Sequence, residues 1–293
     1  MIRRAIALIA LLGLSSVLVP LVGDEPQSAA AQIIGGRVHE SFSPDDGKIF
    51  ILVIGNDARE GNPDASRADA MHIVGINTKT RKAGIINFPR DSYVDVPGHG
   101  TMKMNESLYA GGPELLSQTL ENETGIRLDY WVMTGFVGFQ KIVRDLGGVE
   151  MDVPYAIDDY GSGANLKAGR QVLEPLEALA FNRTRKTLPA GDIDRSTNQG
   201  LFLLALLDKL QAETEDSPAE LLTWMSIARK WTRLDIPPDE MFRLGVLATQ
   251  IARKDVKSQT VPVTIGSAGL ASVVFIQPGA EALYRKLERT GTL

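Results

Sequence analysis

The chain has 293 residues, of which 44% are hydrophobic and 23% charged, a composition typical of a folded protein with one large domain or two small ones. Its formal net charge of −5 excludes binding to nucleic acid or anionic lipid through an overall positive charge. It has no cysteine, so disulfides, thiolate nucleophiles and cysteine zinc sites are all excluded.

The N-terminus has the features of an export segment. Arg3 and Arg4 precede residues 5–23, which carry no charge. The three alanines at 29–31 match the pattern that signal peptidase cuts, whereas the length of the apolar stretch also suits an uncleaved membrane anchor. Both interpretations of residues 1–31 place the rest of the chain outside the cytoplasmic membrane. The Gly-, Ser- and Pro-rich residues 32–47 are predicted to be a linker.

The first predicted strands form a compact group. Residues 49–54 are a continuous apolar run, as in strands that are buried on both faces of a sheet. Residues 71–76 and 84–88 are two further strand candidates, and the polar segment 77–82 between them predicts a hairpin.

The rest of the chain alternates strands with helices, which predicts an α/β layered fold. Strands are expected over 130–133, 149–153 and 259–264. Periodicity, Pro near helix starts and Gly after helix ends predict helices over 113–124, 136–146, 175–181, 193–210, 219–232, 239–252 and 280–289.

Carboxylates stand at the ends of the first two strands. The three histidines have no paired metal-binding spacing, which leaves the chemistry to carboxylates, basic residues, hydroxyls or a carboxylate-bound metal. Asp57 follows the first strand, and Asp69 immediately precedes the second, with Arg67 beside it. If these strands are neighbours, both carboxylates reach one edge of the sheet. Such a pair suits Mg²⁺, which takes one or two carboxylates and shares substrate phosphates.

Arginines also gather at the ends of elements. Arg90 and Asp91 follow the third strand, and Arg195 and Gln199 are four residues apart on one helix face. Guanidinium groups bind phosphate oxygens bidentately, and a helix N-terminus adds donors. Together with a metal, such a cluster describes a pyrophosphate site formed by Arg67, Arg90, Arg183, Arg185 and Arg195.

Each of these residues also has a simpler interpretation. Taken singly, an Arg or Asp in a loop is more often a solvated surface group or a helix cap. Short triplets such as Arg-x-Asp occur by chance, so only the joint pattern indicates a site.

Eight short motifs follow one another along residues 49–210. They are Ile-Gly-Asn-Asp-Ala-Arg (54–59), Arg-Ala-Asp-Ala-Met (67–71), Phe-Pro-Arg-Asp-Ser-Tyr-Val (88–94), Lys-Met-Asn (103–105), Tyr-Ala-Gly-Gly-Pro (109–113), Leu-Gly-Gly-Val (146–149), Arg-Thr-Arg-Lys (183–186) and Gly-Asp-Ile-Asp-Arg (191–195). In this order they resemble the LytR-CpsA-Psr family, also called cell-envelope-related transcriptional attenuator domains.

The resemblance implies a mixed central β-sheet flanked by helices, with an apolar groove for a lipid tail. It implies transfer of a glycopolymer from a polyprenyl-pyrophosphate carrier to a cell-wall acceptor such as peptidoglycan. Asp57 and Asp69 would bind Mg²⁺, or Mn²⁺ in its place. Arg67 or Arg90 would stabilise the transition state, and Asp91 would orient the acceptor hydroxyl. The pyrophosphate would be held by Arg67, Arg90, Lys103, Arg183, Arg185, Arg195 and Gln199.

Four features depart from the family pattern or stay open. Asn56 precedes Asp57 where the family often has Ser, and Asn198 replaces a basic residue. Residues 201–207 are an apolar helical stretch that suits either a lipid tunnel or the core. Residues 48–215 are expected to form the catalytic domain. Residues 216–293 match no family motif, and form either the rest of that domain or a helical accessory extension.

Two other functions use the same residues. Water in place of the wall acceptor would make the protein a polyprenyl-pyrophosphate hydrolase. A protein that binds lipid phosphate without turnover would be an envelope regulator, although a pair of metal-binding carboxylates favours catalysis. DNA binding is disfavoured by the export segment and the acidic charge.

Overall fold

The computed structural model describes residues 47–58 and 66–293. The predicted export segment and nearly all of the predicted linker lie outside these residues. Within the described ranges, no helix combines the length and apolar character needed to cross a bilayer.

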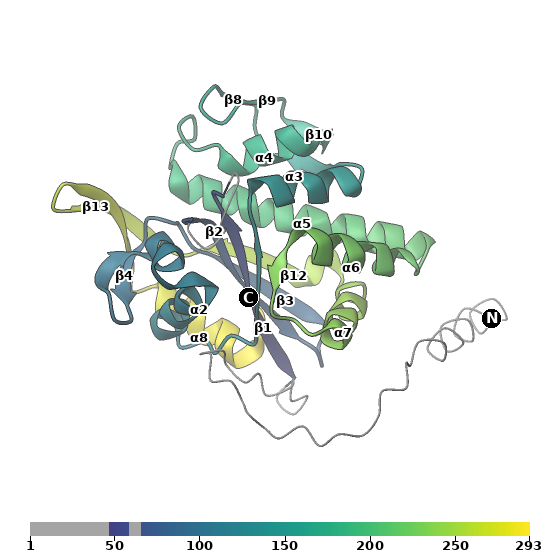
Figure 1. Ribbon diagram of the computed structural model, residues 1–293, viewed down its shortest axis with the longest axis horizontal. Helices are drawn as coiled ribbons and strands as arrows, with labels where there is room; N and C mark the ends of the chain where they lie inside the picture. Colours follow the sequence, from purple (N-terminus) through teal and green to yellow (C-terminus); the bar gives the residue numbers. More distant parts are fainter. Residues whose placement is uncertain (1–46, 59–65) are drawn as a thin grey trace, which may run out of the picture. The chain divides into compact units, whose positions relative to one another are not determined.

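A six-stranded mixed sheet forms the centre of the fold (Figure 1). Neighbouring strands run in the order β11-β6-β1-β2-β3-β12. β2 is antiparallel to both β1 and β3, whereas β6 is parallel to β1 and β12 is parallel to β3. The strands are β1 (Lys48–Asn56), β2 (Ala68–Asn77), β3 (Lys82–Asn87), β6 (Tyr130–Thr134), β11 (Arg233–Leu234) and β12 (Val256–Thr260). The predicted first strand and the following hairpin are therefore confirmed.

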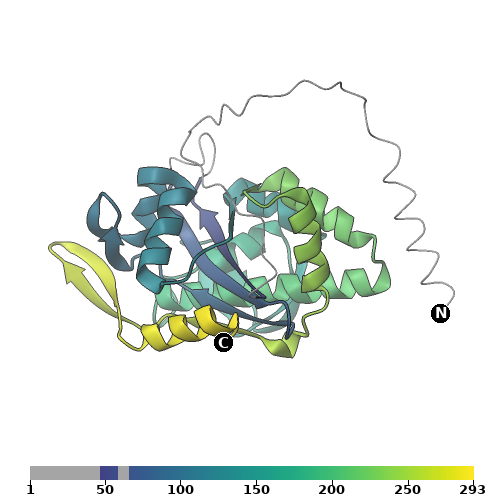
Figure 2. The same cartoon turned by 90° about the horizontal axis from the view of Figure 1, so that it is seen from below.

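Both faces of the sheet are covered, as the apolar run of β1 predicts. Its even-numbered side chains, such as Leu52, pack in a core with α2 (Met104–Thr124) and α8 (Ala280–Thr290). Its odd-numbered side chains, such as Ile51, pack in a second core with α5 (Asp192–Asp216) and α7 (Pro238–Ala248). The result is the expected α/β fold with a mixed central sheet between helical layers (Figure 2).

A third apolar core joins α3 (Phe136–Asp145), α4 (Pro175–Arg183) and α5 to a group of short strands. Phe181 and Phe202 are its largest buried side chains. The strands form two antiparallel pairs, β7 (Val149–Val153) with β10 (Gly169–Leu173) and β8 (Ile157–Asp159) with β9 (Ala164–Leu166).

The C-terminal residues are built into the same sheet. β12 is an edge strand, and α8 packs on the face formed by β2. Gly75 and Gly84 lie opposite each other on β2 and β3, and Leu287 and Leu293 fill the space above them. The other elements after α5 are α6 (Glu220–Trp231), a 3-10 helix, η2 (Arg253–Asp255), and a hairpin of β13 (Val263–Ala268) and β14 (Ala271–Ile276).

Several predicted boundaries are wrong. The strand predicted over 259–264 spans two strands, because β12 ends at Thr260 and β13 begins at Val263 after Pro262. α2 begins nine residues before the predicted start at 113, with a kink at Gly111 and Gly112 where the backbone leaves helical geometry. α7 ends at Ala248, short of the predicted 252. β4 (Tyr93–Val96), β5 (Gly100–Lys103) and the short strands β8–β11 have no counterpart in the sequence prediction.

Gly200 of α5 packs where no side chain fits. A Cβ atom there would stand 2.7 Å from Asn87 Nδ2 and would also clash with the Ser258 hydroxyl. Alanine at a helical glycine normally stabilises a protein by ~1 kcal/mol. We expect Gly200→Ala to destabilise this protein instead, by about 1–3 kcal/mol, because β3 and β12 must shift. Urea unfolding measures the sign, and a gain in stability would contradict the close packing.

Candidate active site

Three strand ends meet at one edge of the central sheet. β1 ends and β2 begins there, with Asn56 paired to Ala68, and antiparallel β3 ends there as well. Asp57 follows β1 directly. Asp69 is the second residue of β2, one position inside the strand rather than before it as predicted. Arg90 lies three residues beyond the end of β3. The topology thus brings both carboxylates and the arginine to one edge.

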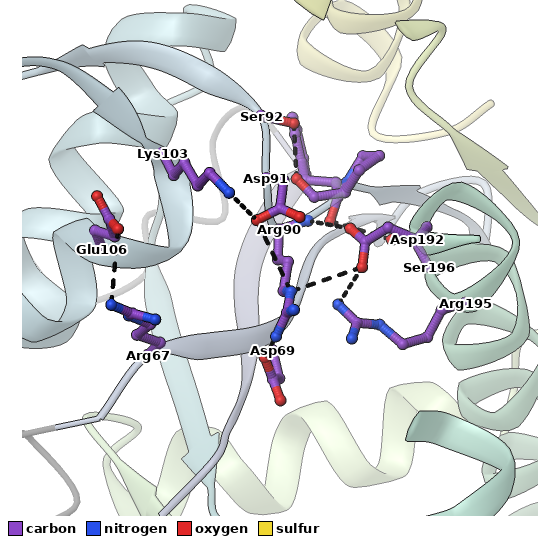
Figure 3. Close-up of polar contacts among 12 residues, drawn as sticks. Arg67, Asp69, Arg90, Asp91, Ser92, Lys103, Glu106, Asp192, Arg195 and Ser196 are labelled. Carbon is purple, nitrogen blue, oxygen red and sulfur yellow. Dashed lines mark hydrogen bonds and ion pairs between the residues drawn. The ribbon is translucent and has the colours of Figure 1, made fainter. Parts of the chain in front are cut away.

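Arg90 is the centre of an ion-pair network (Figure 3). Its Nη1 donates to Asp69 Oδ1 at 2.6 Å, and its Nε lies 3.7 Å from Asp192 Oδ1 and 3.9 Å from Asp91 Oδ1. Burial lowers the pKa of Arg90, but the three carboxylates, Asp69 foremost, raise it by more, so the net pKa is above its usual value. Arg90 is therefore a fixed, permanently charged group.

Asp192, at the start of α5, joins this network to Arg195. One carboxylate oxygen accepts from the Arg90 backbone N–H at 3.0 Å, and the other forms an ion pair with Arg195. Burial is the main influence on the pKa of Arg195 and lowers it. The attraction of Asp192 and Asp69 opposes this effect, whereas Arg90 and Arg185 add to it. Sequence reasoning did not assign Asp192 a role, although its i,i+3 spacing to Arg195 is a signal that was available.

Asp91 and Lys103 form a second pair beside Arg90. Lys103 Nζ donates to Asp91 Oδ1 at 3.0 Å from the end of β5. The carbonyl of Asp91 accepts from the backbone N–H of Val274 in β14 at 3.0 Å. The hairpin β13–β14 thus holds the backbone that carries Asp91.

In the described residues, the side chain of Arg67 does not join the Arg90 network. Its backbone N–H donates to Asp57 Oδ1 at 3.0 Å, which orders the carboxylate. Its side chain is 61% exposed and extends to Glu106 on α2, with a 3.9 Å separation (Figure 3). Glu106 was also not predicted. Of the two arginines proposed to stabilise the transition state, Arg90 is the one held among the other charged residues.

An apolar cavity of about 230 Å³ opens beside the network. Four of the predicted site residues line it, namely Asp69, Arg183, Arg195 and Gln199. Gln199 Nε2 donates to the backbone carbonyls of Asp69 and Asn182 at 3.2 and 3.0 Å, and thereby joins β2 to α4. Apolar lining comes mainly from α3 and α5, including Phe139, Ile142, Phe202, Leu203 and Leu206. The stretch 201–207 therefore contributes to the cavity and to the core at once.

The two predicted metal-binding carboxylates suit a divalent cation that also binds substrate phosphate. Within the described chain, each of Asp57 and Asp69 uses one oxygen in a recorded hydrogen bond and keeps the other without one. The described part of the chain contains no group of three or more His, Cys, Asp or Glu side chains that could hold a metal ion. Two carboxylates with phosphate oxygens are what Mg²⁺ typically takes, so the donor set fits Mg²⁺ only together with a phosphorylated ligand.

His72 lines the same cavity and is fully buried. Its Nδ1 donates to Asn87 Oδ1 at 2.8 Å, and Asn87 Nδ2 donates to Ser258 Oγ at 2.9 Å. Burial lowers the pKa of His72 to about 4, against a smaller raising effect of the Asn87 hydrogen bond. The imidazole is therefore neutral at physiological pH.

The depressed pKa of His72 predicts a loss of stability in acid. In the unfolded chain His72 binds a proton below about pH 6.5, whereas in the folded chain it does so only below about pH 4. The free energy of unfolding therefore falls as the pH drops from about 6.5 to about 4. We expect wild type to lose about 3 kcal/mol more than His72→Gln between pH 7 and 4. Urea unfolding of both proteins across this range measures the difference. The same dependence of unfolding free energy on pH in both proteins would contradict the lowered pKa of His72.

Comparisons with known proteins agree with this fold. The model of the LytR_cpsA_psr family matches residues 23–288. Regulatory protein MsrR of Staphylococcus aureus is 33% identical over 232 residues, which are 78% of this chain and 69% of that protein. Probable cell wall biosynthesis protein LcpB of Corynebacterium glutamicum is 32% identical over 256 residues, covering 80% and 60% of the two chains. A structure of Bacillus subtilis TagT bound to LI-WTA superposes with a TM-score of 0.70 at 24% identity, covering 87% and 95%.

Proposed function

Because this chain belongs to the LytR-CpsA-Psr family, we propose that it is an extracytoplasmic phosphotransferase of cell-wall assembly. It moves a glycopolymer from a polyprenyl-pyrophosphate carrier to a wall acceptor such as peptidoglycan. The protein acts at the outer side of the membrane, either anchored through residues 1–31 or released to the envelope.

The observation that carries this proposal is the apolar cavity that meets a cluster of arginines. A cavity lined by Phe139, Leu203 and Leu206 suits a hydrocarbon chain, and Arg183 and Arg195 on the same lining suit phosphate charge. A polyprenyl pyrophosphate combines both chemistries in one molecule. The cell-wall name of LcpB and the LI-WTA bound by TagT support a wall polymer as partner.

In the proposed mechanism, the residues of this chain mainly position groups and neutralise charge. Arg90, Arg183 and Arg195 pair with the pyrophosphate oxygens. Asp91, held by Lys103, takes the proton of the acceptor hydroxyl. The hydroxyl oxygen forms a bond to the phosphorus that carries the glycan. The bond from that phosphorus to the bridging oxygen breaks, and polyprenyl phosphate leaves. Asp57 and Asp69 would hold Mg²⁺ or Mn²⁺, which supplies additional positive charge to the phosphates.

The test is product analysis with a polyprenyl-pyrophosphate glycan. The full chain in detergent is incubated with the donor, with and without wall acceptor, while Mg²⁺ and Mn²⁺ are varied. We expect metal-dependent formation of glycan phosphate joined to the acceptor, and a loss of roughly 10³-fold in Asp69→Ala. Release of free glycan phosphate at the same rate without acceptor would indicate a hydrolase. Donor binding with no turnover at any metal concentration would indicate a binding protein.

Filling the cavity with a larger side chain should weaken binding of the donor's lipid chain and leave binding of its diphosphate unchanged. Leu203→Trp places a larger side chain in the cavity lining. Because each buried methylene contributes about 0.8 kcal/mol, we expect a loss of at least tenfold in kcat/KM for a long-chain donor and little change for a two-isoprene donor. Leu222→Trp, at a 54% exposed position on α6, is the matched control. Equal losses for both donors would contradict a lipid-binding role for the cavity.

A further inference from the structure

The first turn of α3 presents backbone donors that the protein leaves unused. α3 starts directly after β6, at the sheet edge where β1 also ends, since these two strands are parallel. Its first intrahelical hydrogen bond runs from Phe139 N–H to the Gly135 carbonyl. In the described chain, the N–H groups of Phe136, Val137 and Gly138 have no recorded acceptor. The helix has no capping side chain and no acidic residue in its first turn.

Close packing explains the missing cap. A Cβ atom on Gly135 would lie 2.8 Å from Asn56 Oδ1 and 3.0 Å from the Ala58 carbonyl, so no Ser, Thr or Asp fits at this position. The neighbouring helix α4 is different, because the Glu174 and Glu177 side chains form a complete capping box at its start. The positive end of the α3 dipole is thus unneutralised, and a helix start of this kind favours an anion.

Independent side chains point to the same ligand. Gly135 and Phe136 line the apolar cavity, and so does Arg195, which is only 3% exposed and whose Nε has no hydrogen-bond partner in the described residues. The Arg183 guanidinium lies 4.7 Å from the centre of the Phe136 ring, which places a second cation at the first residue of α3. Asp69 is the carboxylate on this lining, and Arg90 already pairs with it.

We propose that the N-terminus of α3 is a phosphate subsite for the diphosphate of the lipid-linked donor. The first-turn amides donate to one phosphate group, while Arg183 and Arg195 pair with its charge. This inference rests on the proposed function. It adds the backbone amides of α3 to the charged side chains that the sequence predicts at the site. Its ligand chemistry, a diphosphate, can come from the lipid-linked donor or from free pyrophosphate, so both are used as probes.

The test places a charge at the helix start. Val137 is 42% exposed, so Val137→Glu adds a carboxylate beside the subsite without disturbing the core. We expect affinity for inorganic pyrophosphate and for farnesyl diphosphate to fall about tenfold by titration calorimetry. The melting temperature should stay equal or rise, because an acidic residue stabilises a helix N-terminus. Leu176→Glu, at the second position of α4 and 72% exposed, is the matched control and should keep the wild-type affinity.

Amide NMR of the wild type tests the contact itself. Pyrophosphate should shift the amide protons of Val137 and Gly138 downfield, whereas those of Leu176 and Glu177 should not move. Equal affinities in Val137→Glu and Leu176→Glu, or unshifted α3 amides in a protein that binds pyrophosphate, would overturn the subsite. A wild type that binds neither diphosphate would overturn the proposed function as well, so the two failures are distinguishable.

Discussion

Arg90→Ala is expected to lower the rate of glycopolymer transfer by roughly 10³-fold, a loss as large as that expected for Asp69→Ala. Arg90 is the cation that Asp69, Asp91 and Asp192 surround, so its charge is oriented before any ligand arrives. Arg90→Lys should recover only part of the rate, because an ammonium group cannot pair with two phosphate oxygens in a fixed plane. Steady-state transfer rates at saturating donor measure both variants.

The matched control is Arg285→Ala, which removes an exposed arginine of α8 that pairs with the equally exposed Glu281. It should transfer at the wild-type rate. A fall of less than tenfold in Arg90→Ala, with the fold intact by thermal melting, would show that Arg90 serves the structure and not the reaction.

Asp192→Ala is expected to destabilise the folded protein by about 3–5 kcal/mol, because it leaves buried Arg195 without its ion pair. It also removes the acceptor of the Arg90 backbone N–H. Denaturant unfolding at neutral pH measures the change. The loss should be much smaller when Arg195→Met is added, since the double variant has no unpaired buried charge.

Asp216→Ala, at the exposed C-terminal residue of the same helix, is the control and should change stability by no more than ~0.5 kcal/mol. Additive effects of Asp192→Ala and Arg195→Met would contradict the coupling between these two side chains.

The parts of the fold that sequence predicts are those with strong local patterns. β1 is a continuous apolar run, as expected for a strand that is buried on both faces of the sheet. The boundaries of α3, α4 and α6 are marked by Pro, Gly or periodicity. The first half of α2 was missed because Gly111 and Gly112 interrupt its pattern. The hairpin β13–β14 was missed although residues 273–276 form a short apolar run, because such a run alone does not distinguish a strand from a buried helix segment.

The candidate site was predictable in its residue types and less so in its contacts. Asp69 and Arg90 meet because antiparallel pairing brings the start of β2 and the end of β3 together, and Arg195 joins them through Asp192 at the start of α5. The sequence does not predict the role of Asp192, because a carboxylate in the first turn of a helix commonly serves only to stabilise the helix dipole. Its contact with Arg90 is visible only in the folded structure. The α3 amides carry no sequence signal of their own, and only the packing at Gly135 shows them to be free of a cap.

The position of β12 and α8 has a consequence for how the chain folds. β12 pairs with β3, and Leu287 and Leu293 cover the glycine pair of β2 and β3, so the centre of the fold is completed by residues far downstream of β3 in the chain. Such distant pairing makes folding slow, because a long loop must close before the contacts form. Until then one edge of β3 stays open to other strands, and the nascent chain is most prone to aggregation during that interval.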